Sequence, residues 1–377
     1  MKSHSHIALV ELYAGGHHRM YLELLVQQWL SGAYPGKLSL WVSSVFAESH
    51  ADFISALVDS PVEIHVLDEI PRDLESGSGA KHLLKCDRWH GHALKHACDG
   101  GAKHVVFMYL DHAQLAVARR STMNVRVSGI LFKPPERVHS WALPGVVRQV
   151  RKRFILNRLT RSPSLHTIFV LDPAIPVERP FVYMPDGITQ PDPDLSPDEI
   201  RAQTGSGRAR LFLMFGDLSL RKGIHRLADA WSGQGHLLLA GRVPENEPEA
   251  QAAVDRLANR QDVSYYSGYA SNERMAAFFR ASDVVLLPYD GHVGSSNVLI
   301  RAAHAGKPVI ACSDGLVGRL VEQNELGRTV NPTDATAFGS ALDRQEIAFN
   351  PSKMAQFSAL HSPEAMGQIF FSTILTN

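Results

Sequence analysis

Short apolar runs of strand length alternate with segments of helical periodicity along almost the whole chain. Strands buried on both faces are continuously apolar, whereas amphipathic helices repeat apolar residues every three or four positions. The pattern therefore predicts an α/β protein with parallel sheets and helices on both faces. The expected strands are 7–12, 38–42, 62–67, 104–109, 125–131 and 167–170, then 211–215, 236–240, 263–266, 284–288 and 308–311.

A proline- and aspartate-rich stretch separates the two groups of strands and predicts a domain boundary. It contains the turn signal Pro185-Asp186-Gly187, and prolines recur from 191 to 197. We expect two doubly wound, Rossmann-like domains facing each other across a cleft, with ligands at the carboxyl ends of the strands. The expected segments are 1–180, a linker at 181–207, a second domain at 208–350, and an amphipathic helical tail at 351–377.

Composition narrows the class of protein. The 377 residues are 45% hydrophobic, and 38 Lys and Arg balance 38 Asp and Glu, so bulk charge does not favour nucleic acid as a partner. Three widely spaced cysteines without a C-x-x-C pair indicate neither a disulfide framework nor a structural zinc site. Apolar runs fall short of the ~20 residues that span a bilayer. We therefore expect a cytoplasmic protein.

The segment 290–310 is the strongest candidate for chemistry. A strand ends at Pro288, a loop with glycine and serine follows, and a helix begins near Asn297. Free N–H groups at a helix start form an anion site. Gly294 permits close backbone approach, while Ser295 and Ser296 carry hydroxyls suited to capping or to phosphate. An ordinary capped helix after a strand is the alternative.

Several motifs in the second half resemble family 4 glycosyltransferases, which have the GT-B fold of two Rossmann-like domains. The helix ending Ala305-Gly306-Lys307-Pro308-Val309-Ile310 is similar to the end of that family's donor-site signature. The stretch 215–223 resembles its Gly-x-Leu-x-x-x-Lys-Gly loop, and Ser267-Gly268-Tyr269 resembles its following glycine turn. The resemblance implies a tail helix that crosses back to the first domain.

The resemblance also implies an activity and a site. A hexose-like sugar would pass from a UDP- or GDP-sugar to a glycan or lipid-linked acceptor, with retention, without metal and without a bound cofactor. Polysaccharide assembly is the implied setting. Donor diphosphate would contact Gly15, Gly16, Arg221, Lys222, Gly294, Ser295, Ser296 and Asn297, and the donor sugar or nucleoside would contact Gly268, Tyr269, Asp290 and Arg301. Lys222 and His112 are the catalytic candidates, and we expect His112 at the end of a strand.

Three positions depart from the family pattern. Asp217 replaces an arginine, and Val293 and Arg301 replace two glutamates that face the donor sugar and the ribose. These changes keep two alternatives open. One is a non-catalytic GT-B protein that binds a sugar nucleotide or a partner enzyme, and the other is a GT-B sugar-nucleotide epimerase.

A basic amphipathic helix is expected at 146–161, where Val147, Val150, Phe154 and Leu159 recur at nearly helical spacing among six cations. Such a helix suits peripheral contact with an anionic membrane face, and a solvated helix is the alternative. Nucleic acid is not expected, because no aromatic stacking pattern accompanies the cations. A metal is not expected either. Asp192-Pro193-Asp194 lies in the linker, and the His-x-His pairs lack further ligands.

Overall fold

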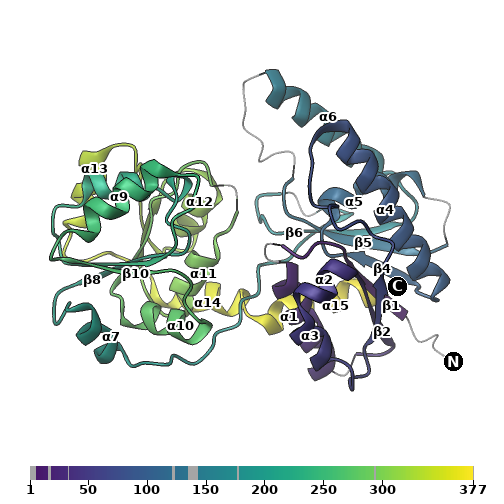
Figure 1. The fold of residues 1–377 in the computed structure, drawn as a ribbon, viewed down its shortest axis with the longest axis horizontal. Helices are drawn as coiled ribbons and strands as arrows, with labels where there is room; N and C mark the ends of the chain where they lie inside the picture. The colour runs from purple at the N-terminus through teal and green to yellow at the C-terminus, as the bar shows by residue number, and fades with distance from the viewer. Residues whose placement is uncertain are drawn as a thin grey trace. The chain divides into compact units, whose positions relative to one another are not determined.

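The computed structural model describes residues 6–15, 18–32, 34–120, 124–134, 143–175, 178–292 and 294–376, with side chains of 143–148 excepted. The chain divides into two compact units (Figure 1). Unit 1 is formed by residues 1–187 and 363–377, and unit 2 by residues 188–362. Each has its own sheet and its own pair of hydrophobic cores.

Unit 1 contains a seven-stranded parallel sheet in the order β3-β2-β1-β4-β5-β6-β7. Neighbouring residues of β1 point to opposite faces, so Ile7 and Leu9 enter one core while Ala8 and Val10 enter the other. The strands are β1 (His6–Glu11), β2 (Lys37–Ser43), β3 (Glu63–Leu67), β4 (His104–Phe107), β5 (Arg126–Leu131), β6 (Leu165–Val170) and β7 (Phe181–Tyr183).

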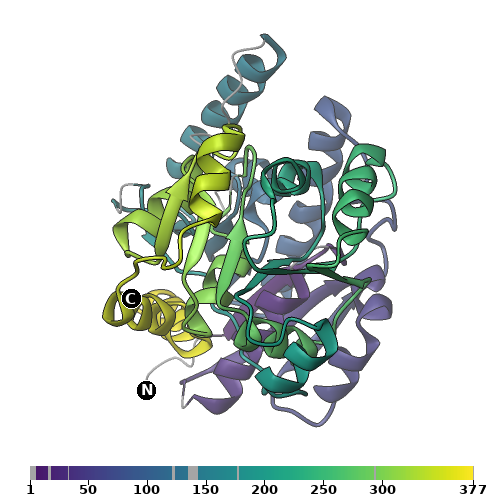
Figure 2. The ribbon, with the colours of Figure 1, turned by 90° about the vertical axis from the view of Figure 1, so that its left-hand side faces the viewer.

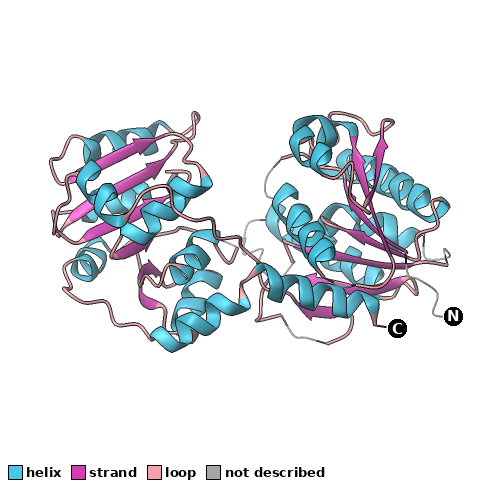
Figure 3. Ribbon diagram, turned by 90° about the horizontal axis from the view of Figure 1, so that it is seen from below, coloured by secondary structure: helices cyan, strands magenta, loops and turns pink. Residues whose placement is uncertain are grey.

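Helices cover both faces of this sheet (Figure 3). One core includes side chains of α1 and α15, and the other includes side chains of α4, α5 and α6. The helices are α1 (His18–Ser31), α2 (Ser44–Ser49), α3 (Ala51–Ala56), α4 (Gly79–Asp99), α5 (Leu110–Arg119), α6 (Leu143–Thr160) and α15 (Pro363–Leu375).

Unit 2 contains a six-stranded parallel sheet in the order β10-β9-β8-β11-β12-β13, with helices on both faces (Figure 2). Its strands are β8 (Leu211–Phe215), β9 (His236–Gly241), β10 (Val263–Ser267), β11 (Val284–Leu287), β12 (Val309–Cys312) and β13 (Gly327–Val330). Its helices are α7 (Pro197–Thr204), the 3-10 turn η2 (Leu220–Lys222), α8 (Ile224–Ala230), α9 (Pro248–Ala258), α10 (Asn272–Ala281), α11 (Asn297–His304), α12 (Gly315–Gln323), α13 (Ala335–Leu342) and α14 (Pro351–Leu360).

The expected α/β class and the two doubly wound parallel sheets are confirmed. The tail differs in detail, because it forms two helices rather than one. The first, α14, packs on α11 within unit 2, and α15 packs against α1 and β6 within unit 1. Pro363 begins α15, and a proline disfavours helical geometry in the residue before it. The expected linker is also partly structured, because it contains β7 and α7.

Candidate functional site

Unit 2 has a topological switch point between β8 and β11. From β8 the chain moves outward through β9 and β10, and it then returns to place β11 on the other side of β8. Loops after two such strands diverge and leave a crevice at their carboxyl ends, where ligands bind in doubly wound sheets. The residues after β8 are 216–223 and those after β11 are 288–297, so the sheet brings both expected donor loops together.

Direct backbone contact holds these two loops together. The Asp290 amide donates to the Arg221 carbonyl at 2.9 Å. Gly223 has a left-handed φ of 78°, and a Cβ there would lie 1.8 Å from the carbonyl oxygen of Pro288. Only glycine permits both the conformation and the approach. In the Lys-Gly pair of the motif, Lys222 therefore supplies the cation, and Gly223 makes the close backbone contact with the other loop.

Lys222 presents a half-buried cation at the switch point. Its Nζ lies 3.5 Å from the Phe215 carbonyl oxygen and 5.7 Å from the centre of the Tyr289 ring. No carboxylate of the described residues lies within ion-pair distance of this amine. Burial lowers the pKa of Lys222 to about 8, because the charged form loses hydration, and the more distant Asp217 carboxylate offsets this loss only in part. A diphosphate would supply the missing negative charge.

Arg221, adjacent to Lys222, contacts the second loop. Its Nη1 lies 2.7 Å from Nδ1 of His292, which joins the loops at a second point. Asp290 is half exposed and is held loosely by Arg226 at 3.9 Å. Arg221 and Asp290 therefore lie beside Lys222, whereas His292 was not among the expected site residues.

The start of α11 differs from a simple cap. Ser296 is the N-cap residue with φ 68°, and its hydroxyl lies 3.1 Å from the Tyr289 hydroxyl instead of capping the helix. The amides of the first turn of α11, which begins at Asn297, therefore lack a side-chain cap. Ser295 is buried beside them, and Gly294 precedes it in the same loop.

The residues expected to contact the donor sugar or nucleoside, Gly268, Tyr269 and Arg301, lie outside the β8 and β11 loops. Gly268 and Tyr269 follow β10, two strands from β8, and Tyr269 is 87% exposed. Arg301 donates to the Thr189 carbonyl at 3.3 Å, and burial lowers its pKa to about 10. It lines a cavity of about 300 Å³ that also touches Gln190, Met275, Phe279, His304 and Lys307.

Unit 1 has its own switch point, between β1 and β4. Here the Ala14 and Gly15 amides donate to Oε1 of Glu75 at 2.5 and 3.1 Å, so a carboxylate already occupies part of the glycine loop. Gly16 lies outside the described residues. His18 is paired with the buried Glu11 at 2.8 Å. Sequence reasoning missed Glu11 and Glu75, because neither belongs to a recognisable motif.

His112 lies in the first turn of α5, not at the end of a strand as expected, because β4 ends at Phe107. Its Nδ1 lies 2.9 Å from the Tyr13 hydroxyl, which joins the carboxyl ends of β1 and β4. Burial, with the neighbouring His90 and His82, lowers the pKa of His112 to about 3. The ring is therefore neutral near pH 7, and with Tyr13 as donor its Nε2 carries the proton.

The basic helix forms as α6, but its apolar residues divide between two faces. Leu159 is fully buried in the core, whereas Val150 and Phe154 are 61% and 67% exposed. The side chain of Val147 lies outside the described residues. No described helix is both long enough and apolar enough to cross a bilayer.

The comparisons relate part of unit 2 to a protein family and the whole chain to solved structures of the same fold. Residues 209–345 match the family Glycosyl transferases group 1. Phosphatidyl-myo-inositol mannosyltransferase of Mycobacterium leprae is 28% identical over 169 residues, which is 43% of each protein. The N-terminal domain of Candida albicans trehalose-6-phosphate phosphatase aligns with a TM-score of 0.69 at 12% identity, over 99% of this chain and 97% of that one. Anabaena HepE, solved with UDP, aligns with a TM-score of 0.67 at 16% identity, over 98% of this chain and 99% of that one.

The fold and the arrangement of the loops define a protein of the GT-B class. Within that class, the match over 209–345 shows that the second unit resembles the glycosyl transferases group 1, in agreement with the family 4 resemblance of the motifs.

The contact at Gly223 generates a prediction. Gly223→Ala should separate the β8 and β11 loops and lower the stability of unit 2, because a Cβ meets backbone that cannot rotate away. Gly205→Ala is the matched control, since its φ is also left-handed but no atom lies within 4 Å of an added Cβ. Urea unfolding followed by circular dichroism compares the two. Equal losses would show that φ alone, and not the contact, demands glycine.

Proposed function

We propose that this protein is a glycosyltransferase that moves a hexose-like sugar from a UDP- or GDP-sugar to a glycan or lipid-linked acceptor. The observation that carries the proposal is Lys222, a half-buried cation that no carboxylate of the described residues pairs with, at the β8–β11 switch point. Negative charge grows on a nucleoside diphosphate as the glycosidic bond breaks, and a preorganised cation stabilises that charge. The complexes of Anabaena HepE with UDP and with UDP-glucose support this donor class.

Each part of the donor has a suitable partner in unit 2. Lys222, Arg221 and the uncapped amides at Asn297 take the diphosphate, with Gly294, Ser295 and Ser296 forming the loop around it. The sugar or nucleoside is bound by Asp290, Gly268, Tyr269 and Arg301. Because Lys222 and Arg221 supply positive charge, the proposed transfer needs no metal on the diphosphate. An arginine donates hydrogen bonds but accepts none, so Arg301 would bind hydroxyl oxygens through their lone pairs.

In unit 1 we assign the sugar-facing role to His112 and the adjacent wall to Gly15 and Gly16. His112 is neutral, and its Nε2–H suits donation to a sugar hydroxyl. Its lowered pKa makes it a poor general base for an inverting reaction. Asp111 is equally unsuited, because its carboxylate accepts from the Phe132 and Lys133 amides at 2.8 and 2.9 Å. These two observations favour the retaining course.

We also propose that α6 contacts an anionic membrane surface. Val150 and Phe154 are one turn apart and exposed, and arginines 151, 153 and 158 surround them on the same helix. Apolar side chains that enter the lipid interface beside cations that meet head groups are typical of interfacial helices. A lipid-linked acceptor would be reached at such a surface.

The donor site is tested by a thermal-shift screen with UDP, GDP, ADP and their sugars. One nucleotide should stabilise the protein, by roughly 2.7 kcal/mol at about 100 times its Kd. Lys222→Ala should lose this shift, and the matched variant Lys353→Ala, which removes an exposed lysine of unit 2, should keep it. The absence of any shift at millimolar nucleotide would contradict the transferase. Binding without turnover would identify the non-catalytic alternative, and product without acceptor the epimerase.

The lowered pKa of Lys222 predicts how nucleotide affinity depends on pH. The amine is charged below its pKa of about 8, so binding is strong there and weakens as the proton is lost at higher pH. The Kd of the bound nucleotide should rise about tenfold between pH 7 and pH 9, because bound diphosphate holds the proton. Calorimetry at several pH values measures this. Lys222→Arg keeps its charge throughout and should show a flat profile, and identical profiles would refute the assignment.

Membrane contact is tested by co-sedimentation with vesicles. Wild-type protein should sediment with vesicles rich in phosphatidylglycerol. With neutral phosphatidylcholine vesicles it should remain in the supernatant. Phe154→Ser should weaken binding at least about tenfold, because a buried phenylalanine contributes roughly 1.5–3 kcal/mol. Val58→Ser is the control, since Val58 is equally exposed in unit 1 but lies away from α6. Equal binding by both variants would exclude α6 as the contact.

A further inference from the structure

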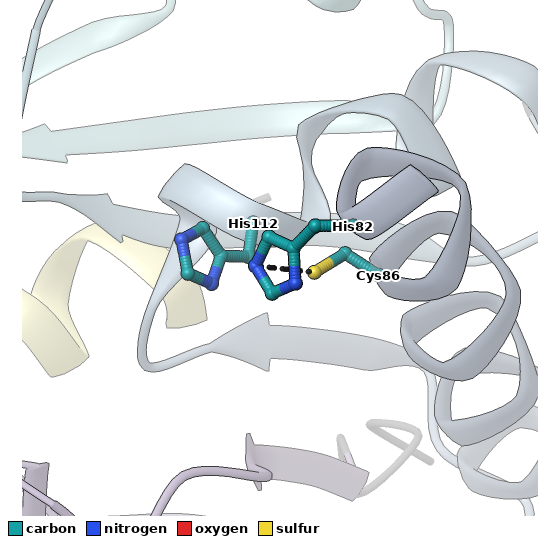
Figure 4. A group of neighbouring side chains, drawn as sticks. All are labelled: His82, Cys86 and His112. Atoms are coloured by element: carbon teal, nitrogen blue, oxygen red, sulfur yellow. Dashed lines mark hydrogen bonds between the residues drawn. The ribbon is translucent and has the colours of Figure 1, made fainter. Parts of the chain in front are cut away.

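Three side chains with metal-binding atoms converge at the switch point of unit 1. His82 and Cys86 lie one turn apart on α4, and His112 lies on the first turn of α5 (Figure 4). One ring nitrogen from each histidine and the Cys86 sulfur all lie within 4.8 Å of one another. Two imidazoles and a thiol form the donor set that Zn²⁺ prefers over the hard oxygen-binding cations.

The spacing of these atoms is close to that of a tetrahedral site. Zinc bonds of about 2.0 Å to nitrogen and 2.3 Å to sulfur place neighbouring ligand atoms roughly 3.3–3.6 Å apart. The His82 Nε2 to Cys86 Sγ distance is already 3.5 Å. The ligand atom of His112 lies within 4.8 Å of the other two, so a closing movement of roughly 1 Å is enough to reach that separation. The Tyr13 hydroxyl lies 2.9 Å from His112 Nδ1 and 3.7 Å from Cys86 Sγ, so its oxygen is within reach as a fourth ligand.

A purely structural role explains this cluster poorly. A buried histidine usually satisfies both ring nitrogens by hydrogen bonds. The ring of His82 packs edge-on against His112 and contacts the Cys86 thiol through Nε2, but its Nδ1 is buried without a hydrogen-bond partner among the described residues. By contrast, His104, which begins β4 at the other end of the strand, bonds a carbonyl through one nitrogen and Ser128 through the other.

The position of the cluster adds a second argument. Tyr13 follows β1 and His112 follows β4, the two strands that border the switch point. Ligands of doubly wound sheets bind at such points. A second group of potential ligands contains no thiol: His92 and His96 lie on α4, and the exposed Glu69 follows β3. Only the first group combines a thiol with a position at the switch point.

We propose that His82, Cys86 and His112 bind one Zn²⁺ ion in unit 1. The ion ties the first turn of α4 to α5 and fixes the ring of His112, which makes it a positioning site separate from the donor diphosphate. Binding forms one zinc–sulfur and two zinc–nitrogen bonds and releases the Cys86 thiol proton to solvent. No oxidation or reduction takes place.

The test uses the full-length chain, stripped with a chelator and titrated with Co²⁺ without oxygen. One equivalent of Co²⁺ should give a thiolate-to-cobalt charge-transfer band and the visible bands of a tetrahedral site. Stoichiometric Zn²⁺ should abolish both. Cys86→Ser should lose the charge-transfer band, whereas Cys98→Ser, which removes another unit 1 thiol outside the cluster, should retain it. His96→Ala, from the second group, should leave the spectrum unchanged.

Histidine variants complete the test. His82→Gln should weaken Co²⁺ binding at least about tenfold, and circular dichroism checks that each variant is folded. Zinc should also raise the melting temperature of wild-type protein, and this gain should be smaller in His82→Gln. A folded wild-type protein that binds no stoichiometric cobalt, or a band that survives Cys86→Ser, would overturn the proposal and leave only a hydrogen-bond network. Nucleotide binding through Lys222 is measured separately and does not affect this result.

Discussion

The ammonium group of Lys222 lies near the carboxyl end of β8, beside a carbonyl oxygen and an aromatic ring, and no carboxylate in the described part of the chain is within ion-pair distance. Desolvation of an unpaired charge opposes folding, which the lowered pKa of Lys222 reflects. The surrounding structure holds the amine there. Gly216 leaves the space that the amine occupies, since a Cβ added there would lie 2.6 Å from Nζ of Lys222. Gly223, which follows Lys222 in the chain, packs its backbone directly against the Pro288 carbonyl. The close approach of the β8 and β11 loops therefore holds the Lys222 amine in place.

The two units use the same topology for different chemistry. In each sheet a switch point lies between the first strand and the strand that returns beside it, so two loops diverge at the same edge. In unit 2 the loops carry Lys222, Arg221 and the amides of α11, which suit an anion. In unit 1 they carry Tyr13 and His112 beside imidazoles and a thiol, which suit neutral hydrogen bonding or a soft metal. The shared fold provides the crevice, and the side chains decide what it binds.

Sequence patterns predicted the two parallel sheets and the loops that follow β8 and β11, because apolar periodicity and short motifs are local signals. They could not predict contacts made across the fold. The pairing of Arg221 with His292 joins positions 71 residues apart, and His112 meets Tyr13 across 99 residues. The strand that was expected to end at residue 109 ends at Phe107, which moves His112 onto a helix. Helical spacing alone also could not tell that Leu159 faces the core while Phe154 faces solvent.

The glycine loop of unit 1 adds a constraint on any anionic ligand. The Ala14 and Gly15 amides each have one proton to donate, and both now point at Oε1 of Glu75. A phosphate or sugar oxygen that binds these amides must therefore displace the Glu75 carboxylate, which costs the charge-assisted hydrogen bonds that it leaves. The segment that bears Glu75 immediately precedes α4, whose first turn carries His82. The glycine loop and the thiol–imidazole cluster are therefore neighbours within unit 1, joined by the short segment between Glu75 and His82.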